Sequence, residues 1–157
     1  MKEYILKNSI SDVAGLVKDI SSEISDYLDE ANLNLFAAAL YEVAINAIEH
    51  GNLGISYEVK KEWIEKNIYH EKLSKLLKTE KAKNTFVEIK LNIENDCITL
   101  IVEDKGQGFK PNMEMEKIKK ESFTRNSGRG MMMMKSYFDE IKYNKTGNAI
   151  TLIKNIK

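Results

Sequence analysis

Two polar side chains interrupt an apolar helical pattern at Leu40–Asn52. Glu42 and Asn46 are four residues apart, and His50 follows after four more, with Glu49 as an alternative at a spacing of three. Side chains at these spacings lie on one face of a helix. The Asn46 carbonyl oxygen is a hard ligand of the kind that Mg²⁺ prefers. Glu42, about 6 Å away along the axis, could orient or deprotonate a nucleophile beside the metal. The pattern therefore predicts a face for a hydrated metal and a nucleotide phosphate.

A glycine-bearing loop follows an apolar run further along the chain. Asp104 stands directly after Cys97–Glu103, and Gly106 and Gly108 come next. Glycines without side chains let the backbone approach a ligand closely. A carboxylate at the end of a strand can accept a hydrogen bond from an exocyclic amine, and the N6 amino group of adenine is such a donor. The loop is therefore a candidate adenine site.

A second glycine pair, Gly128 and Gly130 on either side of Arg129, opens the predicted helix Met131–Phe138. The N-terminus of a helix presents unpaired N–H groups and the positive end of the helix dipole, which together bind phosphate. Arg125 and Arg129 could add charge-assisted hydrogen bonds. The segment therefore predicts a phosphate contact.

Hydrophobic periodicity predicts the elements that must position these residues. Strands are expected at Glu3–Lys7, Thr85–Glu94, Cys97–Glu103, Glu140–Asn144 and Ala149–Asn155, and helices at Ser11–Glu30, from about Asn32 to Asn52, at Tyr57–Asn67 and Tyr69–Lys83, with a short one at Met113–Lys120. This order favours an α+β fold, a two-layer α/β sandwich in which helices cover one face of a mixed, mostly antiparallel sheet.

Composition limits the classes of protein that fit. The 157 residues are 43% apolar and 31% charged, which predicts one domain over residues 1–157. Lysine and arginine together number 24, equal to aspartate and glutamate, so no basic surplus favours direct binding to nucleic acid or to a membrane. Cys97 is the single cysteine, which excludes an internal disulfide and favours a cytoplasmic location. We expect no signal peptide, and no stretch approaching the roughly 20 apolar residues of a membrane span.

The three polar motifs, taken in order, resemble the nucleotide-binding boxes of the GHKL ATPase superfamily. They read Glu42-x-x-x-Asn46-Ala47-x-x-His50-Gly51-Asn52, Asp104-x-Gly106-x-Gly108-Phe109 and Gly128-Arg129-Gly130-Met131. The chain is particularly similar to bacterial anti-sigma factor serine kinases, which share a short lid and the tail pattern Asp139-Glu140-Ile141. The resemblance implies the Bergerat-type ATP-binding fold with ATP and Mg²⁺ as cofactors.

The resemblance also implies residue roles. Asn46 would bind Mg²⁺, Glu42 would be the general base, and Asp104 would hold adenine. A lid at about residues 110–130 would surround the phosphates, shaped by Gly106, Gly108, Gly128 and Gly130 and joined by Arg125 and Arg129. His50 belongs to this cofactor-binding set as a side chain that caps or packs near the site.

The implied function is phosphorylation of a serine on a small anti-anti-sigma partner protein, with a sigma factor as a further partner and a homodimer as the assembly. Two alternatives stay open: a non-catalytic regulator that binds its partner according to the nucleotide, and a detached ATP-binding domain of a sensor histidine kinase. The expected absence of a preceding helix pair with a phosphoacceptor histidine weakens the last. The chain departs from the compact family pattern by a helical insert at about residues 54–84, which leaves the partner surface open.

Overall fold

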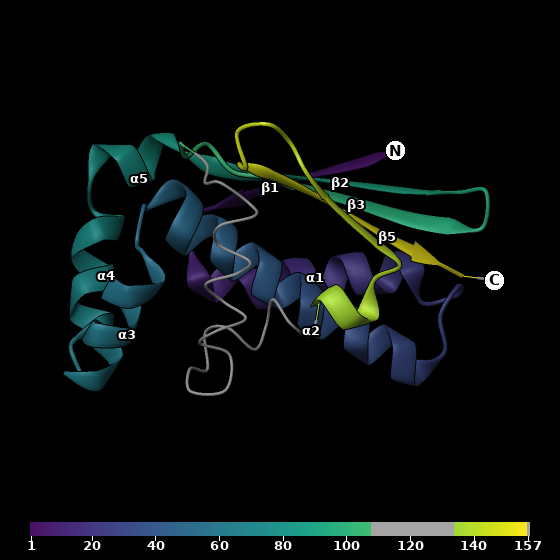
Figure 1. Ribbon diagram of the computed structural model, residues 1–157, viewed down its shortest axis with the longest axis horizontal. Helices are drawn as coiled ribbons and strands as arrows, with labels where there is room; N and C mark the ends of the chain where they lie inside the picture. Colours follow the sequence, from purple (N-terminus) through teal and green to yellow (C-terminus); the bar gives the residue numbers. More distant parts are fainter. Residues whose placement is uncertain (108–133, 157) are drawn as a thin grey trace.

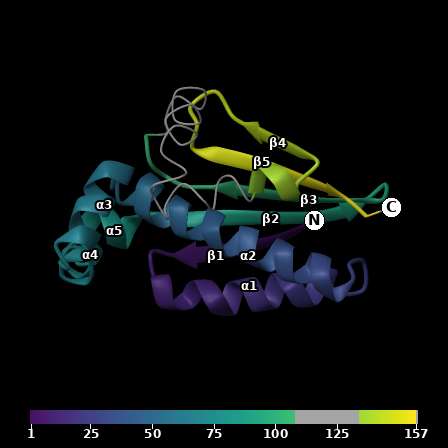
Figure 2. The same ribbon diagram turned by 60° about the horizontal axis from the view of Figure 1, so that its bottom comes forward.

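A five-stranded antiparallel sheet forms one layer of the computed structural model, which describes residues 1–107 and 134–156. The strands are β1 (Lys2–Lys7), β2 (Phe86–Glu94), β3 (Cys97–Glu103), β4 (Glu140–Tyr143) and β5 (Ala149–Asn155), in the order β1-β2-β3-β5-β4 (Figure 1, with β4 labelled in Figure 2). Every pairing among these strands is antiparallel, whereas a mixed, mostly antiparallel sheet was expected. Asn95 and Asp96 join β2 to β3 with φ values of 52° and 58°, which Asn and Asp tolerate better than most residues.

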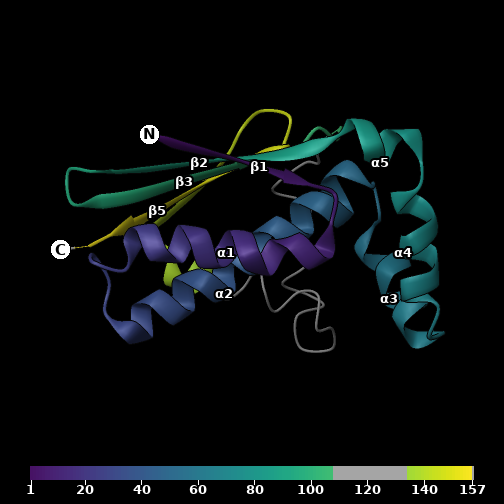
Figure 3. The same ribbon diagram turned by 180° about the vertical axis from the view of Figure 1, so that it is seen from behind.

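Two long helices form the other layer, side by side on one face of the sheet (Figures 2 and 3). They are α1 (Ile10–Ile24) and α2 (Glu30–Asn46), and α2 continues into the π-helical turn η1 (Ala47–Asn52). The predicted first helix was too long at its C-terminal end, and the second begins before Asn32. The Asp29 side chain accepts a hydrogen bond from the Asn32 N–H at 2.8 Å, so it caps α2 and fixes where the helix begins.

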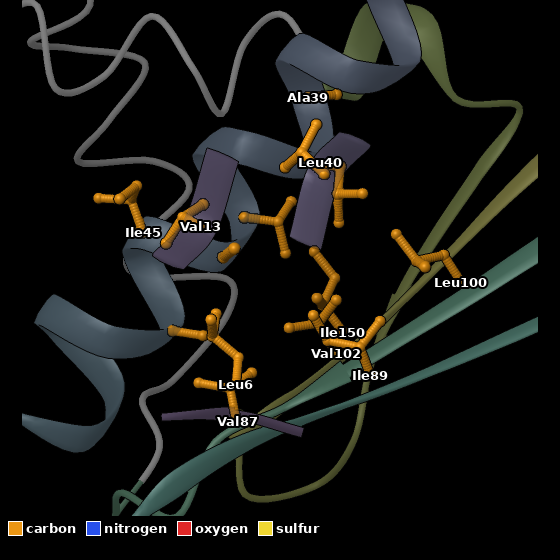
Figure 4. Close-up of a cluster of buried hydrophobic side chains, with 14 of the residues drawn as sticks. Leu6, Val13, Ala39, Leu40, Ile45, Val87, Ile89, Leu100, Val102 and Ile150 are labelled. Atoms are coloured by element: carbon orange, nitrogen blue, oxygen red, sulfur yellow. The ribbon is translucent and has the colours of Figure 1, made fainter. Parts of the chain in front are cut away.

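The core lies between the two layers, and the pattern of each element explains its burial. Val13, Val17, Ile20 and Ile24 form the buried stripe of α1, as expected for an amphipathic helix. Alternate residues of β2 and β3 are buried, which is typical of a sheet covered on one face. Figure 4 shows side chains from both layers in this core, including Leu40 of α2 and Ile89 of β2.

The segment Glu30–Asn52 is 23 residues long and contains an 18-residue stretch with a mean hydropathy of 1.3, so by length and composition it could cross a membrane. The expectation that no stretch approaches a membrane span was therefore wrong for this segment. Its apolar character has another source in the fold, because Phe36, Leu40 and Ile48 are fully buried in the core. A core helix passes the same test as a membrane span.

The insert consists of three short helices at one end of the sandwich (Figure 1), namely α3 (Tyr57–Glu65), α4 (Tyr69–Leu77) and α5 (Glu80–Asn84). The Ser56 side chain caps α3. The second predicted helix, Tyr69–Lys83, divides because the Thr79 hydroxyl accepts the Ala82 N–H and begins α5. Within the insert, Leu73 and Ala82 are buried.

The last helical segment described covers residues 134–137, which agrees with the C-terminal half of the predicted helix Met131–Phe138. Phe138 packs edge-on against Phe36 of α2, with ring centroids 5.5 Å apart. The predicted helix at Met113–Lys120 and most of the lid lie outside the described residues.

Candidate functional site

Glu42 and Asn46 lie one helical turn apart on α2, and both are half-buried. Buried Val43 and Ala44 between them pack into the core. Neither polar side chain forms a hydrogen bond or an ion pair with another residue in the ranges 1–107 and 134–156. The helix therefore presents a carboxylate and an amide oxygen whose polar atoms bond to no other residue in these ranges. A ligand-binding face requires such groups.

The Asp104 loop crosses the end of the same helix. Asp104 follows β3, and its backbone N–H donates to the Asn148 carbonyl at 2.9 Å. Its carboxylate lies directly against Gly51, where a methyl group would overlap the carboxyl atoms. A methyl group on Gly106 would likewise overlap the Gly51 carbonyl. Because neither glycine has space for a Cβ atom, this close crossing explains both residue types and brings two of the three predicted motifs together.

Burial sets the electrostatic character of Asp104. Desolvation raises the pKa of its carboxyl to about 6, while the Gly106 N–H, which donates to Oδ1 at 2.8 Å, opposes the rise. The neighbouring Lys105 ammonium instead reaches Glu88 at 3.4 Å and Glu103 at 3.2 Å. Asp104 is thus a partly desolvated carboxyl group, which suits it to accept a hydrogen bond from a neutral amine.

Asn52, which the sequence pattern marks as the end of a helix, holds this loop through its side chain. The side chain is fully buried; its Oδ1 accepts the Lys105 N–H at 2.6 Å, and its Nδ2 donates to Asn8 Oδ1 at 2.8 Å. Asn8 in turn donates to the Thr85 hydroxyl at 2.7 Å. The residue after Asp104 is therefore tied to η1 and to the ends of β1 and the insert. A single asparagine after a glycine carries no sequence signal of this role.

Glu49 and His50 face the insert. The Glu49 carboxylate is fully buried, with Lys60 Nζ at 2.6 Å and the Tyr69 hydroxyl donating to its other oxygen. The His50 ring stacks on Tyr57 with centroids 3.9 Å apart, and its Nδ1 bonds to the Ile55 carbonyl. Burial lowers the pKa of His50. The placement of His50 agrees with a packing role beside the site, and a contact between His50 and the cofactor stays a prediction.

The remaining predicted residues, Gly108, Arg125, Gly128, Arg129 and Gly130, lie outside the described residues. Their expected contacts with phosphates therefore stay predictions. The described part of the site supplies the helix face, the Asp104 loop and the η1 turn that joins them.

These residues fit Mg-ATP by the chemistry of their donors. Within the ranges 1–107 and 134–156 no group of three or more His, Cys, Asp or Glu side chains could enclose a metal. Mg²⁺ does not need such a cage, since it commonly binds through one or two protein oxygens together with water and substrate phosphates. The Asn46 amide offers one such oxygen, and the lack of side chains on Gly51 and Gly106 lets the Asp104 loop lie directly against η1.

Comparison with known protein families gives a match over most of the chain. A family model described as "Histidine kinase-like ATPase domain" matches residues 12–154, a span that runs from α1 into β5 and includes the insert. No curated protein sequence matches the chain.

Proposed function

The chain belongs to the histidine kinase-like ATPase family, and on this premise we propose that it is an Mg-ATP-dependent protein serine kinase of the anti-sigma factor type. ATP binding and a regulatory role follow from the family itself. The proposal adds the acceptor, a serine on a small anti-anti-sigma protein, and a sigma factor as a second partner. It also adds a homodimeric assembly and a cytoplasmic location.

The observation that carries the proposal is the pair Glu42 and Asn46, one turn apart and half-buried on a helix whose end contacts Asp104. A nucleotide-binding module needs Asn46 and Asp104, whereas Glu42 is of use chiefly when a proton has to be moved. The spacing of four residues places the carboxylate beside the group that would hold the metal. This arrangement favours a transferase over a simple binding domain.

In the proposed mechanism the Asn46 carbonyl oxygen would hold Mg²⁺, and the Asp104 carboxylate would accept a hydrogen bond from the adenine amino group. Bound Mg-ATP would supply the γ-phosphoryl group, and its Mg²⁺ ion would offset the negative charge that develops during the transfer. Glu42 accepts the proton of the serine hydroxyl as the Oγ–P bond forms and the bond to the ADP oxygen breaks. The rigid α2 helix contributes mainly by positioning these groups.

The test is capture of partners from the native cell with the tagged full chain, followed by Mg-ATP and mass spectrometry of the bound proteins. Phosphoserine on a small partner, present with the wild type and absent with Glu42→Gln, is the expected result. A partner that binds but carries no phosphate would replace the kinase with the nucleotide-dependent regulator. Phosphohistidine would instead indicate the domain of a sensor histidine kinase.

A further inference from the structure

The insert is joined to the nucleotide-site helix by a buried polar cluster, which we call the insert lock. It consists of Glu49 on η1, Lys60 on α3 and Tyr69 at the start of α4. Glu49 is 0% exposed and the Lys60 side chain is 18% exposed. Lys60 reaches one oxygen of Glu49 at 2.6 Å, the Tyr69 hydroxyl donates to the other, and the Lys60 ammonium lies 5.5 Å from the centre of the Tyr69 ring.

The insert lock stabilises the position of η1, because it supplies the partners that the buried Glu49 carboxylate needs. A buried carboxylate is strongly disfavoured unless it is paired and hydrogen-bonded, and Lys60 and Tyr69 supply a partner for each oxygen of Glu49. His50, the next residue, adds a stacking contact with Tyr57 of α3. The insert therefore holds η1 through side chains on two of its helices.

The other side of η1 contacts the Asp104 loop. Gly51, two residues after Glu49, lies against the Asp104 carboxylate and against Gly106 without room for a methyl group. Asn52 accepts the Lys105 N–H at 2.6 Å. Close-packed contacts transmit a displacement rather than absorb it. A shift of Glu49 therefore moves the surface on which Asp104 rests.

We propose that Lys60 and Tyr69 are positioning residues: by holding Glu49 they set the place of Gly51 and of the Asp104 carboxylate, so that the insert tunes how strongly the site selects adenine. The inference rests on the proposed function, in which Asp104 binds adenine. Because coupling between sites is reciprocal, nucleotide binding also strengthens the insert lock. A partner bound to α3 or α4 would thereby change the affinity for the nucleotide through the insert lock.

The test compares the Kd values of Mg-ATP and Mg-GTP by calorimetry on the full chain. Tyr69→Phe removes one hydrogen bond and Lys60→Met removes the cation, and each should lower the preference for ATP by about fivefold or more, the lower end of typical couplings. Lys60→Arg keeps the cation and should restore most of the preference.

Matched controls change the same residue types away from the lock. Tyr27 is 49% exposed, and Lys66 forms an exposed ion pair with Glu62 at 2.5 Å. Tyr27→Phe and Lys66→Met should therefore leave the ratio of the two Kd values at the wild-type level. Thermal melting of every variant separates altered selectivity from lost stability.

Each outcome decides the inference. A folded Tyr69→Phe variant with wild-type selectivity overturns it, and so does an equal loss of affinity for both nucleotides, because a merely structural role predicts that pattern. If Lys60→Met does not fold, Tyr69→Phe alone decides. A wild-type chain that does not prefer ATP over GTP removes the proposed role of Asp104 and the inference with it. If the wild type prefers ATP and the lock variants prefer it equally, the inference is overturned but the proposed role of Asp104 is not.

Discussion

ATP affinity should depend on the protonation of Asp104 in mildly acidic solution. Burial raises the pKa of this carboxyl to about 6 from its ordinary value of 3.8. The ionised form accepts a hydrogen bond from an amine, whereas the protonated form carries a hydroxyl donor in place of one acceptor. We therefore expect Mg-ATP to bind the ionised form, so that affinity rises as the pH rises through about 6.

The size of the effect follows from the ionised fraction. A carboxyl with a pKa of about 6 is roughly 9% ionised at pH 5 and roughly 91% ionised at pH 7, and the apparent Kd scales inversely with the binding-competent fraction. The Kd of Mg-ATP should therefore fall by about tenfold between these two pH values. Adenosine carries no phosphate, and its Kd should depend on pH in the same way.

The stability of the free protein should change in the opposite direction. The folded chain binds this proton more tightly than the unfolded chain, since the pKa of Asp104 is higher when it is buried. The free energy of unfolding therefore has a contribution that is present below pH 3.8 and is lost as the pH rises to about 6. Asp104→Asn has no such contribution, so comparing its thermal melting with that of the wild type between pH 4 and 6 isolates it.

Calorimetric titrations with Mg-ATP at a series of pH values provide the assay, with Asp104→Asn as the control. The phosphates of the nucleotide also titrate, but they do so equally with both proteins, so the difference between the two curves belongs to Asp104. Identical curves, or a wild-type affinity that improves with acid, would refute the reasoning. Unchanged discrimination between ATP and GTP in Asp104→Asn would remove the adenine contact.

Three further substitutions test the rest of the site. Glu42→Gln should leave Mg-ATP binding intact and slow phosphotransfer by about 10²–10⁴-fold; a normal rate of partner phosphorylation would show that Glu42 is not the base. Asn46→Ala should abolish Mg-ATP binding, and calorimetric affinity in the micromolar range would contradict its metal role. Gly51→Ala should weaken Mg-ATP binding and lower Tm, because the methyl group would overlap Asp104. Gly15→Ala is its control: apart from its chain neighbours and the backbone of its own helix, no atom of residues 1–107 and 134–156 lies within 4 Å of a Cβ there. This change should therefore stabilise α1 by about 0.5–1 kcal/mol and leave binding unchanged.

Strands were more predictable than helix ends. The predicted Cys97–Glu103 and Ala149–Asn155 agree with β3 and β5 at both ends, because alternating apolar residues next to turn residues are a strong local signal. The first helix was predicted to end six residues beyond Ile24, since Tyr27 and Leu28 continue the apolar spacing. The start of α2 is set by the Asp29 carboxylate, which accepts the Asn32 N–H. Several nearby polar residues could have served as this cap.

The candidate site, like the fold, was predictable from the sequence only in part. Residue type and spacing predicted Glu42, Asn46 and Asp104 as site residues, because their chemistry is visible locally, and their roles stay predictions. The roles of Glu49 and Asn52 were missed, since they depend on partners that are distant in sequence. Tyr69 is 20 residues from Glu49, and Lys105 is 53 residues from Asn52. Burial and pairing of this kind are properties of the folded chain and have no local pattern.

The π-helical turn explains why the periodicity was misleading at the end of the motif. A spacing of four places Glu42, Asn46 and His50 on one face only while the helix keeps 3.6 residues per turn. In η1 the Leu53 N–H bonds to the Ile48 carbonyl, five residues earlier, at 2.9 Å, so each turn holds more residues and the faces rotate.

Glu49 and Asn52, three residues apart, would share a face in an α-helix. The wider turn separates them, so that Glu49 contacts Lys60 of the insert while Asn52 contacts Lys105 of the Asp104 loop. Single π-helical turns are rare and frequently mark functional sites. Here the turn gives one short segment two buried polar contacts in different directions, which is the geometry that a joint between the insert and the nucleotide site requires.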